Sequence, residues 1–268
     1  MKDTSDSPVL LDTADGIATV TLNRPGSMNA LSEDMLDALQ QTWDALAADR
    51  SVKAVILRGA GNHFCAGHNL KEMTARRSDP DGGKQYFNEL FETCSRMMLS
   101  IVKLPQPVIA EVQGIATAAG CQLVATCDLA VASEDAKFAT SGVNIGLFCS
   151  TPMVALSRNV TRKQAMEMLL LGEFLPAARA VDIGLVNRAV PQDELAMVAQ
   201  RMARTIADKA PVAIKIGKEA FYRQAEMSLE QAYAYAGAAM AENMLARDTT
   251  KGIDAFIRKE PMPPWEGD

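Results

Sequence analysis

Two glycine-containing turns, about fifty residues apart, are the parts of this sequence best suited to chemistry. The first lies in HFCAGHNLKEM, residues 63–73, and the second in VQGIATAAGCQLVATCD, residues 112–128. Each turn comes where an apolar strand gives way to a helix. Gly67 allows a bend that can aim the N–H of His68 inward. Ala119 precedes a helix, where N–H groups lack helical partners and the dipole favours negative charge.

Two fixed N–H donors suit a reaction that develops negative charge on a carbonyl oxygen. Removal of one such donor typically costs about 10²–10³ in rate. The two turns together therefore indicate an oxyanion hole in which a thioester carbonyl could sit. A single glycine turn after a strand would be weak support, because many α/β folds contain one for steric reasons alone.

Strands that alternate with helices must position these turns. Residues 9–12 and 17–22 predict a hairpin around Asp15 and Gly16, and Ser32 is the expected cap of a helix that reaches Asp49. Apolar runs predict buried strands at residues 54–57, 108–112 and 129–132. This alternation indicates an α/β architecture.

The second half of the chain is mainly helical by its pattern. Capping-box spacing occurs at Thr161 with Gln164 and at Ser228 with Gln231, and one further strand is expected at residues 185–190. A face of small residues near residues 232–240 suits close packing against another helix. We therefore divide the chain into a core, residues 1–200, and a C-terminal helical oligomerisation region, residues 201–268.

Composition excludes several classes of function. The 268 residues carry a net charge of −6 and contain no block of Lys and Arg, which argues against nucleic acid as a partner. The apolar runs are too short to cross a bilayer, so no membrane association is expected. The first eight residues resemble neither a secretory signal nor an Arg-rich transit peptide, so a cytoplasmic location is expected.

The cysteines and histidines do not form a pattern typical of a disulfide framework or a metal site. The five cysteines are odd in number and widely spaced, which favours reduced thiols. The histidines are His63 and His68 alone, and no carboxylate pair lies near them at ligand spacing. We expect no metal.

Four segments of the chain resemble the crotonase superfamily, also called the enoyl-CoA hydratase/isomerase family. They are LNRPGSMNAL at 22–31, FCAGHNLKEM at 64–73, VQGIATAAGCQL at 112–123 and AVDIGLVNRAV at 180–190. The resemblance extends over residues 9–259. It implies an α/β fold of the ClpP/crotonase type, a spiral of strand–strand–helix repeats followed by helices that form trimers, often paired into hexamers.

The resemblance also implies an acyl-CoA thioester as ligand, with coenzyme A as part of the substrate and no separate cofactor. Ala119 would supply the second oxyanion N–H. Arg24 is a candidate phosphate contact, and Lys259 could reach the nucleotide bound by a neighbouring subunit. The residues expected along the thioester and the adenine-pantetheine part are Ala66, His68, Asn69, Leu70 and Lys71.

The chain departs from the family pattern where proton transfer is expected. Hydratases of the family carry glutamates at the positions of Gln122 and Gly142, and neither is present here. One positioned acid or base is worth about 10²–10⁴ in rate, so we expect ordinary enoyl-CoA hydration to be weak. Cys149 lies in the loop that follows, from which other branches of the family recruit catalytic groups. The amino-acid sequence of this loop resembles that of a branch that also lacks the glutamates.

Several readings remain open from the sequence. The leading one is an enzyme that forms a thioester enolate by C–C cleavage, with proton transfer from the substrate, a water on Gln122 or the Cys149 loop. A protein that binds or senses acyl-CoA without catalysis is the alternative. A serine peptidase of the related Clp-type fold is disfavoured, because no Ser/His/Asp set occurs in suitable turns. The side chains of His68 and Cys149 could act chemically or simply pack.

Overall fold

The computed structural model describes residues 6–267, and its centre is a six-stranded sheet in the order β1-β2-β3-β4-β6-β9. The first pair is antiparallel and the remaining pairs are parallel. The expected hairpin forms with positive φ at both Asp15 and Gly16, the backbone that tight hairpins require. The strands are β1 Val9–Ala14, β2 Ile17–Leu22, β3 Ala54–Gly59, β4 Val108–Val112, β6 Leu129–Ser133 and β9 Arg188–Val190.

A second, three-stranded sheet lies beside the main one in the order β5-β7-β8. Its strands are β5 Ile115–Thr117, β7 Lys137–Ala139 and β8 Leu175–Pro176. After β4 the chain forms β5 and then α4 (Ala119–Thr126), and after β6 it forms β7 and then further helices. Strands β4 and β6 are thus each followed by a short strand in the second sheet and then by helix, which is the strand–strand–helix repeat. After β3, Cys65 forms only an isolated bridge to Ala116 of β5 before α2.

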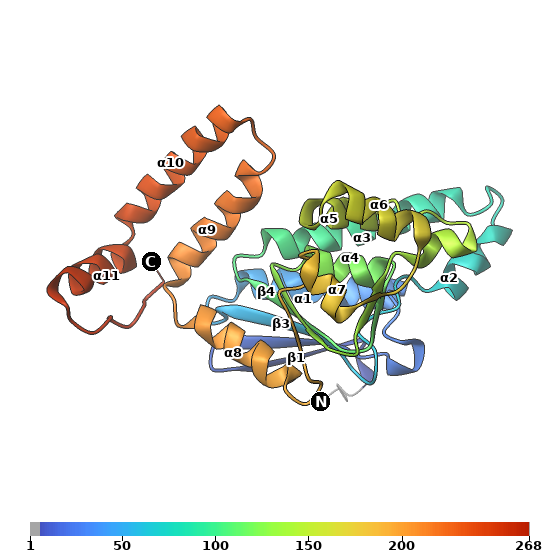
Figure 1. Ribbon diagram of the computed structural model, residues 1–268, viewed down its shortest axis with the longest axis horizontal. Coiled ribbons are helices and arrows are strands. Elements are labelled where there is room, and N and C mark those ends of the chain that lie inside the picture. The colour runs from blue at the N-terminus through green and yellow to red at the C-terminus, as the bar shows by residue number, and fades with distance from the viewer. Residues whose placement is uncertain (1–5, 268) are drawn as a thin grey trace.

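Helices cover both faces of the main sheet (Figure 1). On one face, α1 (Glu33–Ala48) and α3 (Lys84–Lys103) share the larger apolar core with α4. On the other face, α8 (Leu195–Ala207) packs on Ala54, Ile56 and Ile109. Alternate residues of a strand point to opposite faces, so Val55 and Leu57 of the same strand belong to the larger core.

The remaining helices follow the local signals of the sequence. Ser32 Oγ accepts the Met35 N–H at the start of α1, and both expected capping boxes form, at α6 and at α10. The helices not yet given bounds are α2 Leu70–Ala75, α5 Pro152–Asn159, α6 Arg162–Leu171, α7 Ala177–Asp182, α9 Pro211–Gln224, α10 Leu229–Leu245 and α11 Arg247–Arg258.

Helices α9–α11 form an arm that projects from the core (Figure 1). The expected boundary at residue 200 falls inside α8, which packs on the sheet, and the arm begins at Pro211. Lys218 of α9 joins the arm to the core: its Nζ donates to Asp128 Oδ2 at 2.7 Å and to the carbonyls of Ile101 and Gln106. Tyr222 Oη donates to the other Asp128 oxygen at 3.0 Å.

Candidate active site

The structure brings the two glycine turns into contact. The Thr117 N–H donates to the Cys65 carbonyl at 3.0 Å, so the first turn runs alongside β5. A Cβ placed on Gly67 would lie 3.1 Å from the backbone nitrogen of Ala119, and one placed on Gly120 would overlap the Cys65 carbonyl. Glycine at these positions is therefore required by the close approach of one turn to the other.

The N–H groups of His68 and Ala119 have no acceptor within the described part of the chain. Leu31 bridges to the first turn through the Gly67 carbonyl at 2.7 Å and the Asn69 N–H at 3.3 Å. In a parallel bridge of this kind the N–H of the residue between them points away from the partner. Ala119 opens α4, so its N–H has no partner within the helix.

The side chain of His68 is held in a dry environment. Its ring meets that of Phe91 edge-on, with centroids 5.7 Å apart, and both ring nitrogens are buried without a partner among the described residues. Burial lowers the pKa of His68 below its usual 6.5. The imidazole is therefore neutral at pH 7, and it has unused capacity to donate and to accept a hydrogen bond.

Gln122 also presents a polar atom without a protein partner. The residue is the fourth of α4 and is 5% exposed. Its Oε1 is buried and has no hydrogen bond within residues 6–267. Buried polar groups are nearly always paired, so an orphaned amide oxygen on the helix that Ala119 opens indicates a place where a ligand or water binds.

Gly142 has no room for a side chain in this conformation. A Cβ there would overlap the Leu147 carbonyl oxygen and lie 2.9 Å from Cys149 Sγ, because the chain turns back on itself through Gly146. Cys149 is 6% exposed, and burial raises the pKa of its thiol. A neutral thiol is a poor nucleophile, so the structure does not favour a thiolate mechanism.

The residues expected to bind coenzyme A are only partly gathered. Asn69 caps α2, since its Oδ1 accepts the Lys71 N–H at 3.1 Å. Leu70 and Lys71 are exposed on α2, and the Ala66 N–H is bonded to the Met28 carbonyl. Arg24 lies 3.5 Å from the carboxylate of Asp34, which offsets part of its charge.

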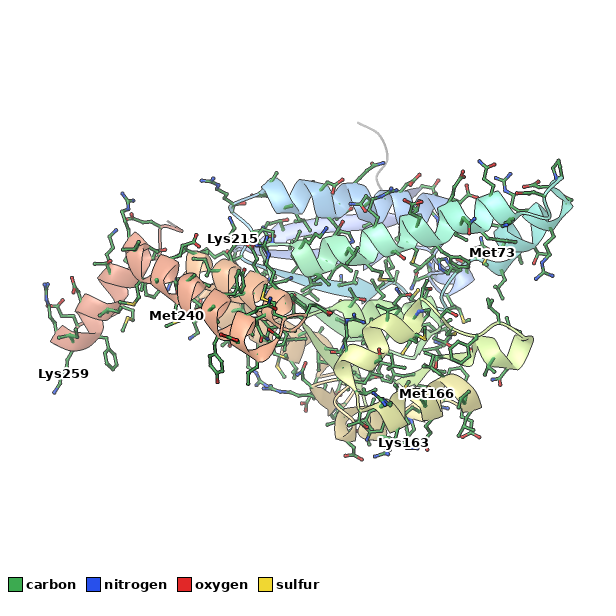
Figure 2. All side chains as sticks on the ribbon, turned by 90° about the horizontal axis from the view of Figure 1, so that it is seen from above. Met73, Lys163, Met166, Lys215, Met240 and Lys259 are labelled. Carbon is green, nitrogen blue, oxygen red and sulfur yellow. The ribbon has the colours of Figure 1, made fainter. Side chains whose placement is uncertain are left out.

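Lys259 stands apart from these residues. It ends α11 near the far end of the arm, whereas Met73 of α2 lies at the opposite end of the molecule (Figure 2). Lys259 therefore cannot share a ligand with α2 of its own chain.

Asn29 holds the first turn, a role that the sequence alone did not assign. Its side chain is fully buried, and its Nδ2 donates to the carbonyls of Ala60 at 2.9 Å and His63 at 2.8 Å. Its Oδ1 accepts the Arg24 N–H. An asparagine next to apolar residues in LNRPGSMNAL was the available signal, because a buried amide must find several partners.

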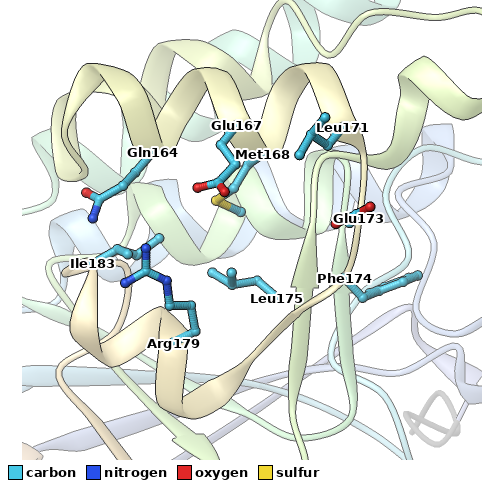
Figure 3. Close-up of a pocket in the computed structure, with 9 residues that line it drawn as sticks. All are labelled: Gln164, Glu167, Met168, Leu171, Glu173, Phe174, Leu175, Arg179 and Ile183. Atoms are coloured by element: carbon cyan, nitrogen blue, oxygen red, sulfur yellow. The ribbon is translucent and has the colours of Figure 1, made fainter.

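Two cavities lie away from the turns. One, of about 70 Å³, sits between α6 and α7 beside Glu167 and Arg179 (Figure 3). The other, of about 570 Å³, lies between the end of α3 and α9 beside Lys103 and Tyr222. No group of three His, Cys, Asp or Glu residues within residues 6–267 could hold a metal ion. The helices of that same range are all too short or too polar to cross a membrane.

The fold and the paired turns define a crotonase-type protein. The chain belongs to the enoyl-CoA hydratase/isomerase family, whose model matches residues 12–268. An enoyl-CoA hydratase from Mycobacterium smegmatis has a crystal structure that is 52% identical, with a TM-score of 0.92 over 96% of this chain and 98% of that one. Human enoyl-CoA hydratase domain-containing protein 3 is 44% identical, with a TM-score of 0.91 over 96% of this chain and all of that one.

The comparisons correct the expected location. The mitochondrial enoyl-CoA hydratase domain-containing protein 3 of Xenopus laevis is 46% identical over 93% of this chain and 83% of the relative, and its counterparts from rat, mouse, human and zebrafish are also named mitochondrial. The expectation of a cytoplasmic protein was wrong, and these relatives point to mitochondria. An N-terminal composition unlike a transit peptide was a poor guide to location.

Proposed function

We propose that this protein binds acyl-CoA thioesters and stabilises a thioester enolate with the N–H groups of His68 and Ala119. The observation that carries the proposal is that these two N–H groups come from separate turns in contact with each other and lack acceptors among the described residues. Donors already in place stabilise developing negative charge without reorganisation during the reaction. Membership of an acyl-CoA family supports the choice of ligand.

A reaction that starts with C–C cleavage suits these residues best. In decarboxylation of a 2-carboxyacyl (malonyl-type) thioester, the bond between the α-carbon and the carboxylate breaks. Its electron pair forms the enolate, whose oxygen accepts hydrogen bonds from the two N–H groups. A proton from water then adds to the α-carbon as CO₂ departs. The first step needs no general base, and the chain carries an amide at Gln122 and no side chain at Gly142.

Ordinary hydration of enoyl-CoA is expected to be weak for the same reason. An amide can orient water but cannot take its proton, and loss of one positioned acid or base costs about 10²–10⁴ in rate. The neutral His68 ring and the neutral Cys149 thiol are the other candidates for proton transfer, the thiol as a donor since burial raises its pKa.

Arg24, Ala66, Asn69, Leu70 and Lys71 are proposed to contact the coenzyme A part, and Lys259 to do so from a neighbouring subunit. The distance between Lys259 and Met73 along the molecule supports a contact across subunits (Figure 2). This assignment requires a homotrimer or a dimer of trimers, which we propose as the assembly.

A binding or sensing protein without catalysis is the second candidate, favoured by the orphaned Gln122 amide in place of a carboxylate. A panel of acyl-CoA thioesters, including 2-carboxyacyl and 2-enoyl compounds, tested by calorimetry and by product analysis separates the two. Turnover of any cleavable thioester with slow hydration of crotonyl-CoA supports the enzyme, and tight binding without product supports the sensor. Acyl-CoA that binds no more tightly than free coenzyme A would contradict a site for the thioester carbonyl.

A further inference from the structure

The residue before the second N–H donor has an unusual backbone. Ala118 has φ +51° and ψ −120°. This is the conformation of the first central residue of a type II′ turn, where a Cβ is crowded and glycine is favoured. Met28 and Lys259 also have positive φ, but their ψ values of 41° and 36° place them in the ordinary left-handed helical region.

The structure around Ala118 enforces this conformation. The Ala118 N–H donates to the Ala139 carbonyl at 2.9 Å, and its own carbonyl accepts the Gln122 N–H at 3.1 Å. The first bond belongs to the contact between β5 and β7, and the second is the first bond of α4. The peptides on both sides are therefore held, and the strain is concentrated at Ala118.

The strained ψ angle decides where the Ala119 N–H points, because ψ rotates the peptide plane that follows. The Ala118 methyl also contacts the other turn: a Cβ built on Gly67 would lie 3.0 Å from it. The Ala118 methyl therefore occupies space that is free because residue 67 is a glycine. Together with Ala119 N and Thr117 O, each 3.1 Å from the same Cβ position, this methyl limits how closely the two turns, and hence the two N–H donors, approach.

We infer that Ala118 is a positioning residue, whose methyl group and strained backbone hold the Ala119 N–H in line with the carbonyl of a bound thioester. The inference rests on the proposed function. Glycine would adopt the same φ and ψ without strain, but it would lack the contact to Gly67 and would leave the peptide freer to rotate. The strained backbone at Ala118 lowers the stability of the fold and restricts the direction of the Ala119 N–H.

The test compares Ala118→Gly with the full-length wild type, using 4-dimethylaminocinnamoyl-CoA as the probe. The absorption of this conjugated thioester moves to longer wavelength when its carbonyl accepts hydrogen bonds. We expect Ala118→Gly to reduce the shift and to bind the probe about tenfold more weakly, a part of what complete loss of one oxyanion donor costs. Its affinity for free coenzyme A, which has no acyl carbonyl, is expected to equal that of wild type.

Two further variants separate positioning from folding. Ala118→Ser keeps the Cβ and should retain the wild-type shift. Asp15→Gly replaces a non-glycine residue that also has φ +51°, in the β1–β2 hairpin outside the two turns, and should change neither the shift nor probe affinity. The Tm of Ala118→Gly should be at or above that of wild type because strain is relieved.

The outcomes are distinct. A full wavelength shift and wild-type probe affinity in Ala118→Gly would overturn the positioning role, as would equal losses in Asp15→Gly. If wild type binds the probe without any shift, the oxyanion hole itself is wrong, and the proposed function fails independently of Ala118.

Discussion

At the scale of single residues, the site consists of polar groups that lack partners within the described chain. The N–H groups of His68 and Ala119, the His68 ring and the Gln122 amide oxygen are all in this state. Each such group destabilises the folded protein, since a buried donor or acceptor left without a hydrogen bond costs about 1–3 kcal/mol. Their concentration around two touching turns is the residue-level reason to place the ligand there.

Gln122→Glu should raise the hydration of crotonyl-CoA by about 10² or more over wild type, because it restores one acid or base at the site. Steady-state loss of enoyl absorbance measures this, with Gln122→Met as the control that removes the amide without adding a carboxylate. The absence of any gain in Gln122→Glu, in a variant that still binds thioester, would show that residue 122 does not face the reacting carbons.

Adding Gly142→Glu to Gln122→Glu would not be a suitable way to restore the second carboxylate. The Leu147 carbonyl and Cys149 Sγ occupy the space of its Cβ, so this variant should lower Tm by several degrees through overpacking. Thermal unfolding of Gly142→Ala checks the same point with a single methyl. An unchanged Tm in Gly142→Ala would show that the loop yields readily.

His68 should make stability depend on pH. Its pKa in the folded protein lies below the usual 6.5, so between these two values the unfolded chain holds a proton that the folded chain does not. Stability is therefore complete above pH 6.5 and falls as pH drops, by at most about 1.4 kcal/mol for each pH unit, until the folded pKa is reached.

Urea unfolding of wild type and His68→Gln between pH 7.5 and 5 measures this dependence. The difference between the two proteins isolates His68 from Glu111, whose pKa is raised by burial and whose effect has the opposite sign. Parallel curves for the two proteins would mean that the His68 ring is not held neutral.

At the scale of elements, a buried charge pair joins the arm to the core. Lys218 of α9 is bonded to Asp128 and to two carbonyls, and its side chain is 6% exposed. Asp128 in turn accepts the Val108 N–H at 2.7 Å, at the start of β4. One lysine thus connects α9 with the end of α3, the start of β4 and the corner after α4.

Lys218→Met should destabilise the protein by about 3–5 kcal/mol, because it leaves the Asp128 carboxylate buried without its cation. The double variant Lys218→Met, Asp128→Asn should lose less than the sum of the two single changes. Chemical denaturation of wild type, the two single variants and the double variant gives the four unfolding free energies of this double-mutant cycle. Additive losses would indicate that the pair is not coupled.

At the scale of the whole molecule, the arm presents large apolar side chains to solvent. Leu245 is 85% exposed and Phe256 is 73% exposed in the single chain. Burial of such a side chain is worth about 1.5–3 kcal/mol, so an apolar arm of this size favours packing against other copies of the chain. The same assembly is needed for Lys259 to approach a site.

If the arm forms the proposed trimer contact, Leu245→Glu combined with Phe256→Glu should shift the protein toward monomer at micromolar concentration, because a charge would have to be buried at the contact. Sedimentation velocity measures the change. Leu11→Glu, at a 48% exposed position on β1, is the matched control outside the arm. Retention of the full assembly by the arm variant would place the interface elsewhere.

Local patterns in the sequence predicted those elements that depend on short-range interactions. The hairpin at Asp15 and Gly16, the Ser32 cap and the two capping boxes depend on interactions within a few residues, so their spacing sufficed to predict them. The strand expected at residues 185–190 was shorter, beginning at Arg188, because its pairing with β6 is non-local. The short strands β5 and β7 were missed for the same reason.

The chemistry of the site divides in the same way. The sequence by itself determined that two turns with backbone donors exist and that residues 122 and 142 carry no carboxylate. Only the tertiary structure decided that Gly67 meets Ala119, that Ala118 is strained and that the loop to Cys149 fills the space beside Gly142. These are contacts between segments distant in sequence, and their geometry follows from the packing of the whole chain.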